Sequence, residues 1–262
     1  EPAGADGRRG DDLARNDVYA GESQRRAGGQ RNRVDAHIGH RVAGVDVGVV
    51  TRKGASESGR PALEAAAEVL PWFNDYFGMP YPLPKLDMIA VPGSSQFFGA
   101  MENWGAIMYF EPYLLVDPRL SSESDRQLVF ATVAHEVAHQ WFGNLVTMDW
   151  WDDLWLNEGF ATWMEAKAER ALHPERDTGL QVVNGIRESA LRSDASSATH
   201  PVVQPVPTVE AASQAFDAIA YSKGSAVIHM LEDALGEAGF RAGIRRYLAK
   251  YAYTNAATDQ LW

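Results

Sequence analysis

The sequence predicts an α+β fold that is mainly helical, with a small sheet near its N-terminal end. Two short stretches alternate like strands, Lys85–Val91 and Ala106–Phe110, and prolines and glycines bound them. From Ser121 onward, helical periodicity dominates the chain. We therefore expect a sheet followed by a set of packed helices.

The helices are expected in a definite order. Pro61 begins the first one at a first-turn position, and the pattern stops near Asn74–Gly78. A helix over 121–142 has Ser122 or Ser124 as cap candidates. Residues 173–208 are irregular, with prolines at 201, 205 and 207. The remaining helical patterns cover 151–172, 210–220, 222–235 and 237–251.

Composition limits the function classes. The chain has 262 residues, enough for one large domain or two small ones, and no cysteine, which excludes disulfides and Cys-ligated metal. Residues 1–60 hold eleven Lys/Arg and nine Asp/Glu, whereas residues 61–262 hold thirteen and twenty-six. An acidic main part argues against a nucleic-acid surface and suits an amine-bearing substrate.

The first 59 residues form an atypical segment, which we expect to be disordered or non-native. They hold one aromatic residue, Tyr19, against twenty-six in the remainder, and eleven of the twenty-three glycines. Such a composition buries too little apolar surface to offset ordering entropy. Only residues 37–50 alternate like a strand, and His37 and His40 are too loosely placed to be assigned as metal ligands. Translation from another reading frame is one explanation, which peptides matching residues 1–50 in protein from the native host would exclude.

A metal-binding motif lies in the helix predicted over 121–142. His135 and His139 stand four residues apart, so on a helix they lie about 40° apart and face one ion together. Glu136 points elsewhere but can reach a water beside that ion. Catalytic zinc takes three protein ligands and keeps one position open. The motif therefore indicates two of the three protein ligands of a hydrolytic zinc site, with an acidic residue beside them.

A third ligand is expected from Glu158. It follows His139 by nineteen residues, inside a second helical segment, so the chain has room to turn and return. The alternative is that the two histidines are merely packed or solvated on an amphipathic helix. The presence of Glu158 in a helical segment favours one zinc ion per chain held by two His and one Glu.

Four blocks together resemble the aminopeptidase N family of zinc gluzincins. They are GAMENWG at 99–105, HEVAHQWFGNLVT at 135–147, WLNEGFAT at 155–162 and AYSKGSAVIHML at 220–231. The resemblance implies a thermolysin-like zinc metallopeptidase catalytic domain over 60–262, truncated at its C-terminal end. It does not cover residues 1–59. The large N-terminal β domain and the C-terminal helical domain of that family have no counterpart in this chain.

The resemblance also assigns roles to single residues. His135, His139 and Glu158 would bind zinc, and Glu136 would be the general base that takes a proton from the attacking water. Tyr221 would hold the oxyanion opposite the metal. Glu102 would capture the free α-amino group of the substrate. Further substrate-binding residues are expected around Glu102, namely Phe98, Gly99, Ala100, Met101 and Asn103.

Two polar residues and three further histidines lie in or near these blocks. Asn157 and Thr162 are candidates for orienting the ligands. His173, His200 and His229 have no such context and are left as surface or core residues.

The resulting expectation is a zinc-dependent aminopeptidase acting on peptides with a free N-terminal amine. An endopeptidase and a bifunctional epoxide hydrolase are alternative enzymes. A fragment with an intact motif but little activity, acting at most as an interaction module, is the non-enzyme alternative, because absent flanking domains would leave the pocket open. No apolar run approaches the ~20 residues of a membrane span, and the sequence does not distinguish a cytoplasmic from an exported protein.

Overall fold

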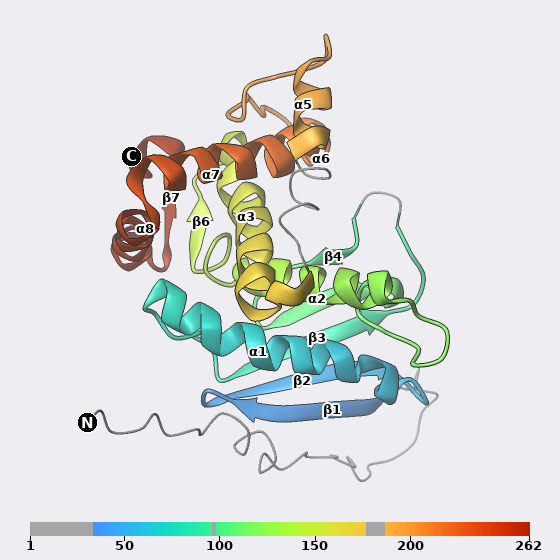
Figure 1. The fold of residues 1–262 in the computed structure, drawn as a ribbon. Helices are drawn as coiled ribbons and strands as arrows, with labels where there is room; N and C mark the ends of the chain where they lie inside the picture. The colour runs from blue at the N-terminus through green and yellow to red at the C-terminus, as the bar shows by residue number, and fades with distance from the viewer. Residues whose placement is uncertain (1–33, 96–97, 177–186) are drawn as a thin grey trace, which may run out of the picture.

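A five-stranded mixed sheet forms one side of the molecule (Figure 1). The computed structural model describes residues 34–95, 98–176 and 187–262. The strands are β1 (Val34–Val42), β2 (Val45–Arg52), β3 (Lys85–Val91), β4 (Ala100–Met101) and β5 (Ala106–Phe110), in the spatial order β1-β2-β3-β5-β4. The three central strands run parallel, and β1 and β4 are antiparallel to their neighbours. The expected bounds of β3 and β5 are confirmed.

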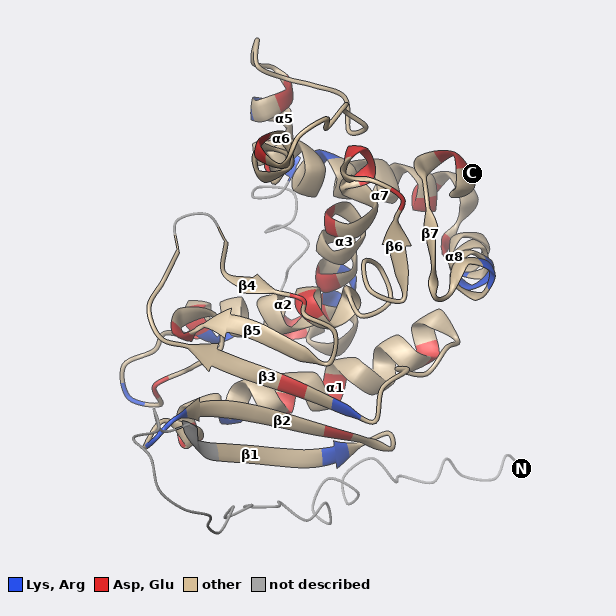
Figure 2. Ribbon diagram, turned by 180° about the vertical axis from the view of Figure 1, so that it is seen from behind, with Lys and Arg blue, Asp and Glu red and all other residues tan. Residues whose placement is uncertain are grey.

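Helices α1 (Arg60–Phe77) and α2 (Glu123–Ala138) cover one face of this sheet, and in Figure 2 no helix among the described residues lies over the other face. Alternate strand residues such as Val49, Met88 and Ile107 are fully buried beneath the helices. Burial of each such side chain contributes about 1.5–3 kcal/mol. Gly78 ends α1 in the left-handed conformation, at φ 65°.

Strands β1 and β2 come from the atypical segment, in which the sequence predicts strand-like alternation only over residues 37–50. Val47 and Val49 of β2 belong to the main core, and β2 pairs with β3 from Asp46 to Val50. Over residues 34–59 the structure therefore differs from the expectation, because alternating valines allow a glycine-rich stretch to bury one face of a strand. Residues 1–33 lie outside the described residues, and whether the segment is native stays a prediction.

The helical part packs around α3 (Trp155–Leu172), which crosses α2 (Figure 1). Helices α7 (Gly224–Leu235) and α8 (Glu237–Tyr251) match the expected ranges to within two residues. Two short strands, β6 (Val146–Met148) and β7 (Thr254–Ala256), pair in parallel between the α2–α3 connection and the segment after α8. Short 3-10 turns cover Ser56–Gly59, Glu111–Tyr113, Trp151–Asp153, Pro174–Arg176 and Thr258–Gln260.

Helix α2 begins as expected but ends early. The Ser122 hydroxyl accepts from the Asp125 amide, and the Asp125 carboxylate accepts from the Ser122 amide, which makes a capping box. The predicted end at residue 142 is wrong, because the chain unwinds after Ala138 into a wide turn. Gly143 permits that turn with φ 125°, a conformation that other residues rarely adopt.

The region between α3 and α7 is the least regular. Residues 177–186 lie outside the described residues, and α5 (Glu188–Asp194) is a short helix within the stretch expected to be irregular. The helix expected over 210–220 is instead α6 (Val209–Gln214), a break, and a π-helical turn (Ile219–Lys223) that leads into α7. A small second core underlies this region, formed by Leu154, Val206, Ala212, Ala215 and Ala220.

Candidate active site

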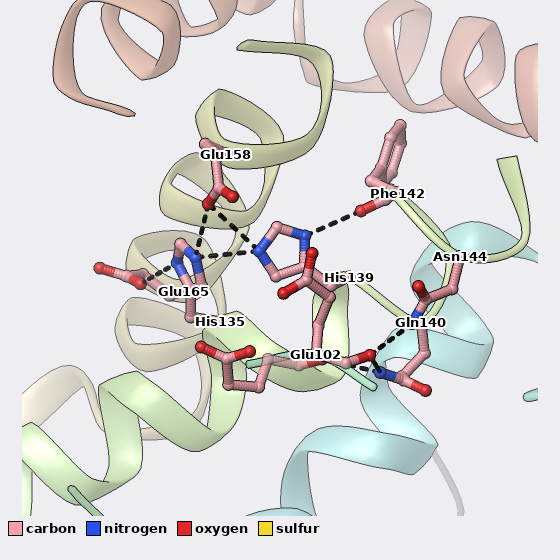
Figure 3. Close-up of polar contacts among 9 residues, drawn as sticks. Glu102, His135, His139, Gln140, Phe142, Asn144, Glu158 and Glu165 are labelled. Atoms are coloured by element: carbon pink, nitrogen blue, oxygen red, sulfur yellow. Dashed lines mark hydrogen bonds and ion pairs between the residues drawn. The ribbon is translucent and has the colours of Figure 1, made fainter. Parts of the chain in front are cut away.

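The three expected metal ligands converge between α2 and α3 (Figure 3). The Nε2 atoms of His135 and His139 are 3.1 Å apart, and Glu158 Oε2 lies 3.3 Å from each. Zinc bonds of about 2.0–2.1 Å place tetrahedral ligand atoms about 3.3–3.4 Å apart. The three atoms are therefore spaced as a zinc ion requires.

Both imidazole rings are oriented by a partner on the far side. His135 Nδ1 lies 2.7 Å from Glu165 Oε2, and His139 Nδ1 lies 2.9 Å from the carbonyl oxygen of Phe142. A carboxylate and a carbonyl only accept, so each Nδ1 donates, and in a neutral ring the Nε2 lone pair then faces the ligand position. Two lone pairs and a carboxylate oxygen meeting at one buried point repel unless a cation lies between them. These residues thus fit a metal ion.

Carboxylates dominate the electrostatics of this site. Burial alone would lower the pKa of both histidines, but neighbouring carboxylates outweigh it and raise the pKa of His139 to about 9 and that of His135 well above its ordinary value. Burial would raise the pKa of Glu158, yet the two histidines lower it to about 2. The same negative potential that favours protonated rings attracts a divalent cation.

Glu136 points into the same space without a partner. Its side chain is 6% exposed, and its Oε2 has no hydrogen bond. Burial raises the pKa of Glu136 to about 7, against the lowering effect of His135 and His139. A buried carboxylate with one free oxygen and a pKa near neutrality is suited to take up and return a proton.

Glu102 faces this carboxylate across a short gap. The ligand atoms of Glu102, Glu136 and His139 all lie within 4.8 Å of one another. The Glu102 backbone is fixed by two side chains from the turn after α2, because Gln140 Nε2 and Asn144 Nδ2 donate to the Glu102 carbonyl at 3.2 and 2.7 Å (Figure 3). Gln140 Oε1 also accepts from the amide of Gly105.

The neighbours of Glu102 form the sheet edge that faces the site. Ala100 and Met101 make up β4, and Gly99 accepts from Phe110 through its carbonyl oxygen. A Cβ atom on Gly99 would lie 2.7 Å from the Tyr113 ring, so only glycine fits there. Phe98 is 53% exposed and packs on Phe110 with ring centroids 5.6 Å apart. Asn103 is exposed and donates its backbone N–H to Met101.

Tyr221 lies beside the metal ligand His135. Its ring stacks on His135 at a centroid distance of 6.0 Å and an interplanar angle of 10°, and Glu158 is among the carboxylates that act on its hydroxyl. Burial and the nearby carboxylates raise the pKa of Tyr221, so the phenol keeps its proton as a donor.

Two glycines set how closely α7 approaches α3. A Cβ atom on Gly159 would lie 2.9 Å from the carbonyl carbon of Gly224. Gly159 follows Glu158 directly, and Gly224 stands three residues after Tyr221. Their contact therefore fixes the distance between the carboxylate and the phenol.

A cavity opens beside these residues. Its volume is about 300 Å³, and Met101, Glu102, Trp151, Phe216 and Glu158 are among the residues that line it. It is partly open to solvent, and Glu102 and Glu158 give its wall two carboxylates.

Sequence reasoning missed the residues that orient the ligands. Glu165 and the Phe142 carbonyl take this role at the histidine rings, and the roles expected for Asn157 and Thr162 stay a prediction. Glu165 stands two helical turns after Glu158, which places both on one face of α3. That spacing was the available signal.

Comparison with known proteins places the chain in a family. Residues 61–262 match the sequence profile described as the peptidase family M1 domain. The chain belongs to peptidase family M1. This confirms the resemblance to aminopeptidase N and the mainly helical α+β fold that it implied.

Several proteins named as aminopeptidases are similar to this M1 peptidase domain. It is 48% identical to "Aminopeptidase M1-B" of Oryza sativa subsp. japonica over 224 residues, which cover 86% of the chain and 25% of the relative. It is 46% identical to "Endoplasmic reticulum aminopeptidase 2" of Bos taurus, over 77% of the chain and 21% of the relative. It is 45% identical to "Probable aminopeptidase 2" of Sulfurisphaera tokodaii, over 86% and 28%.

These matches cover most of the chain but only a part of each relative. The chain spans about a quarter of the length of these relatives. A match of 224 residues in a chain of 262 begins at about residue 39 or earlier, so it includes β2 as well as the catalytic blocks. Among the described helices, none is long and apolar enough to cross a membrane.

Proposed function

We propose that this M1 domain is the catalytic part of a zinc-dependent aminopeptidase, which removes the N-terminal residue of peptides. The observation that carries the proposal is the convergence of the His135, His139 and Glu158 ligand atoms beside the unpaired carboxylate oxygen of Glu136. When bound there, zinc would lower the pKa of water to about 7 and polarise the scissile carbonyl.

Glu136 acts as the proton carrier in this proposal. Its free oxygen takes a proton from the water that attacks the first peptide carbonyl. It then returns that proton to the leaving amine. A pKa near 7 suits both transfers, because neither protonation state is strongly preferred at neutral pH.

Glu102 selects the free amine. An ammonium group within reach of its carboxylate forms charge-assisted hydrogen bonds, which contribute about 1.5–3 kcal/mol each. An acylated amine offers no positive charge and would leave the carboxylate unpaired. The hydrogen bonds from Gln140 and Asn144 to the Glu102 backbone support this role, because they hold the acidic group still.

Tyr221 donates to the developing oxyanion. Burial and the nearby carboxylates raise the pKa of its hydroxyl, which keeps its proton and can donate it to a carbonyl oxygen that becomes negative beside the metal ligands. One such donor is worth about 10²–10³-fold in kcat.

Hydrolysis of alanine anilide tests the proposal, beside its N-acetylated twin and with or without a chelator. We expect cleavage of the free amine alone, abolished by the chelator and restored by zinc. The matched variant is Glu102→Gln, which keeps the shape and removes the charge, and we expect a raised KM for the free amine. Cleavage of both twins by the unmodified chain would point to an endopeptidase. Stoichiometric zinc binding without cleavage of either twin would favour a metal-binding module with little activity of its own.

A further inference from the structure

Three consecutive backbone amides before α7 are all bound by one residue. The Asp217 carboxylate accepts through Oδ1 from the amides of Ile219 and Ala220, at 2.9 and 3.0 Å. Its carbonyl oxygen accepts from the amide of Tyr221 at 3.1 Å. Asp217 therefore caps the π-helical turn that carries the Tyr221 side chain.

His200 holds the other oxygen of this carboxylate. Its Nε2 lies 2.7 Å from Asp217 Oδ2, and its Nδ1 lies 2.7 Å from the carbonyl oxygen of Pro201. Neither partner donates, so the two contacts together favour the doubly protonated, positively charged ring. Partial burial would lower the pKa of His200, but the bonds to Asp217 and to the Pro201 carbonyl raise it above its ordinary value.

The far end of the turn is tied to the same region. Lys223 Nζ donates to Asp194 at 2.6 Å and lies 3.5 Å from the carbonyl oxygen of His200. Asp194 also accepts from the Thr199 hydroxyl. Asp217, Lys223 and Asp194 are thus the charged groups around His200, and together they tie residues 194–201 to both ends of the turn.

We propose that the His200–Asp217 ion pair is a positioning device for Tyr221, which sets the place of the phenol against His135 and Glu158. A π-helical turn is rare and often marks a functional position, and it needs such outside support. The small core beneath it has three alanines among its five buried residues, and Tyr221 packs against this core. This inference rests on the proposed function, because it concerns the group assigned to the oxyanion.

The first test is a double-mutant cycle in the same chain, loaded with zinc. We expect His200→Gln to lower kcat on alanine anilide about tenfold, part of the 10²–10³-fold carried by the hydroxyl, with KM within about twofold and zinc content unchanged. In a Tyr221→Phe background the same substitution should change kcat by less than about twofold. Asp75→Asn, which breaks an exposed ion pair with Arg241 elsewhere on the surface, is the matched control and should change nothing.

Two kinetic results would overturn the inference. One is an unchanged kcat in His200→Gln where Tyr221→Phe is impaired. The other is an equal loss in both backgrounds, which would indicate general destabilisation. A Tyr221→Phe variant with full activity would instead refute the oxyanion role in the proposed function.

Hydrogen exchange tests whether Asp217 holds the turn in place, and this test does not require catalytic activity. Asp217→Ala removes the acceptor of two amides, so a peptide spanning 217–223 should exchange about tenfold faster than in the unmodified chain, while peptides of α2 keep their rates. Unchanged exchange in that peptide would overturn the positioning role even in a chain without activity.

Discussion

Replacing Glu165 by Gln should weaken metal binding without removing a ligand. The Glu165 carboxylate lies 2.7 Å from His135 Nδ1, and both side chains are largely shielded from solvent. An amide oxygen can still accept from Nδ1, so the ring keeps its orientation and only the negative charge is lost. Loss of such an outer partner typically lowers metal affinity 10–100-fold, which equals about 1.4–2.7 kcal/mol. Competition with a chromophoric zinc chelator at fixed pH measures this difference directly.

The control for this substitution lies one turn further along α3. Glu169→Gln changes another buried carboxylate, which pairs with Arg176 and does not reach the metal ligands. It should leave zinc affinity unchanged. A zinc dissociation constant for Glu165→Gln within threefold of the unmodified chain would refute the electrostatic reasoning. An equal loss of affinity in both variants would refute it as well.

Three further outcomes follow from the geometry. Glu136→Gln should retain stoichiometric zinc but lose about 10²–10⁴-fold in turnover, and a variant that loses its metal would contradict the separation of base from ligands. Gly159→Ala, which places a methyl group 2.9 Å from the Gly224 backbone, should lower the free energy of unfolding by about 1–3 kcal/mol, and an unchanged urea midpoint would exclude this tight contact. The stability difference between the unmodified chain and His200→Gln should be full below pH ~6.5 and shrink as the pH rises through the raised pKa of His200. Thermal midpoints at several pH values measure it, and a difference that grows with pH would refute it.

Much of the site could be predicted because its information is local. Two histidines four residues apart on a helix share a face whatever surrounds them. Strands β3 and β5 also follow from alternation within a few residues and from the glycines and prolines beside them. The structure brings the predicted ligands His135, His139 and Glu158 together, since one reversal of the chain suffices for that.

The missed features depend on contacts far along the chain. Gln140 and Asn144 look like ordinary polar residues after a helix, and their acceptor, the Glu102 carbonyl, lies about forty residues earlier. The segment before Tyr221 has a helical pattern in the sequence, yet in the structure the Asp217 cap, which His200 contacts, begins a separate turn there. Periodicity detects an apolar face, but it does not detect which distant amide a carboxylate binds.

The pairing of β6 with β7 has a consequence for how the protein is made. Strand β6 lies in the connection between α2 and α3, and β7 follows α8. The pair can therefore form only after Thr254, the partner of Val146, has been synthesised. Asp149 likewise donates to the carbonyl of Ala256. During synthesis all three metal ligands leave the ribosome well before the strand that steadies their connecting loop. We therefore expect tight metal binding late in synthesis, after β7 has been made and has paired with β6, rather than as soon as the histidine motif is complete.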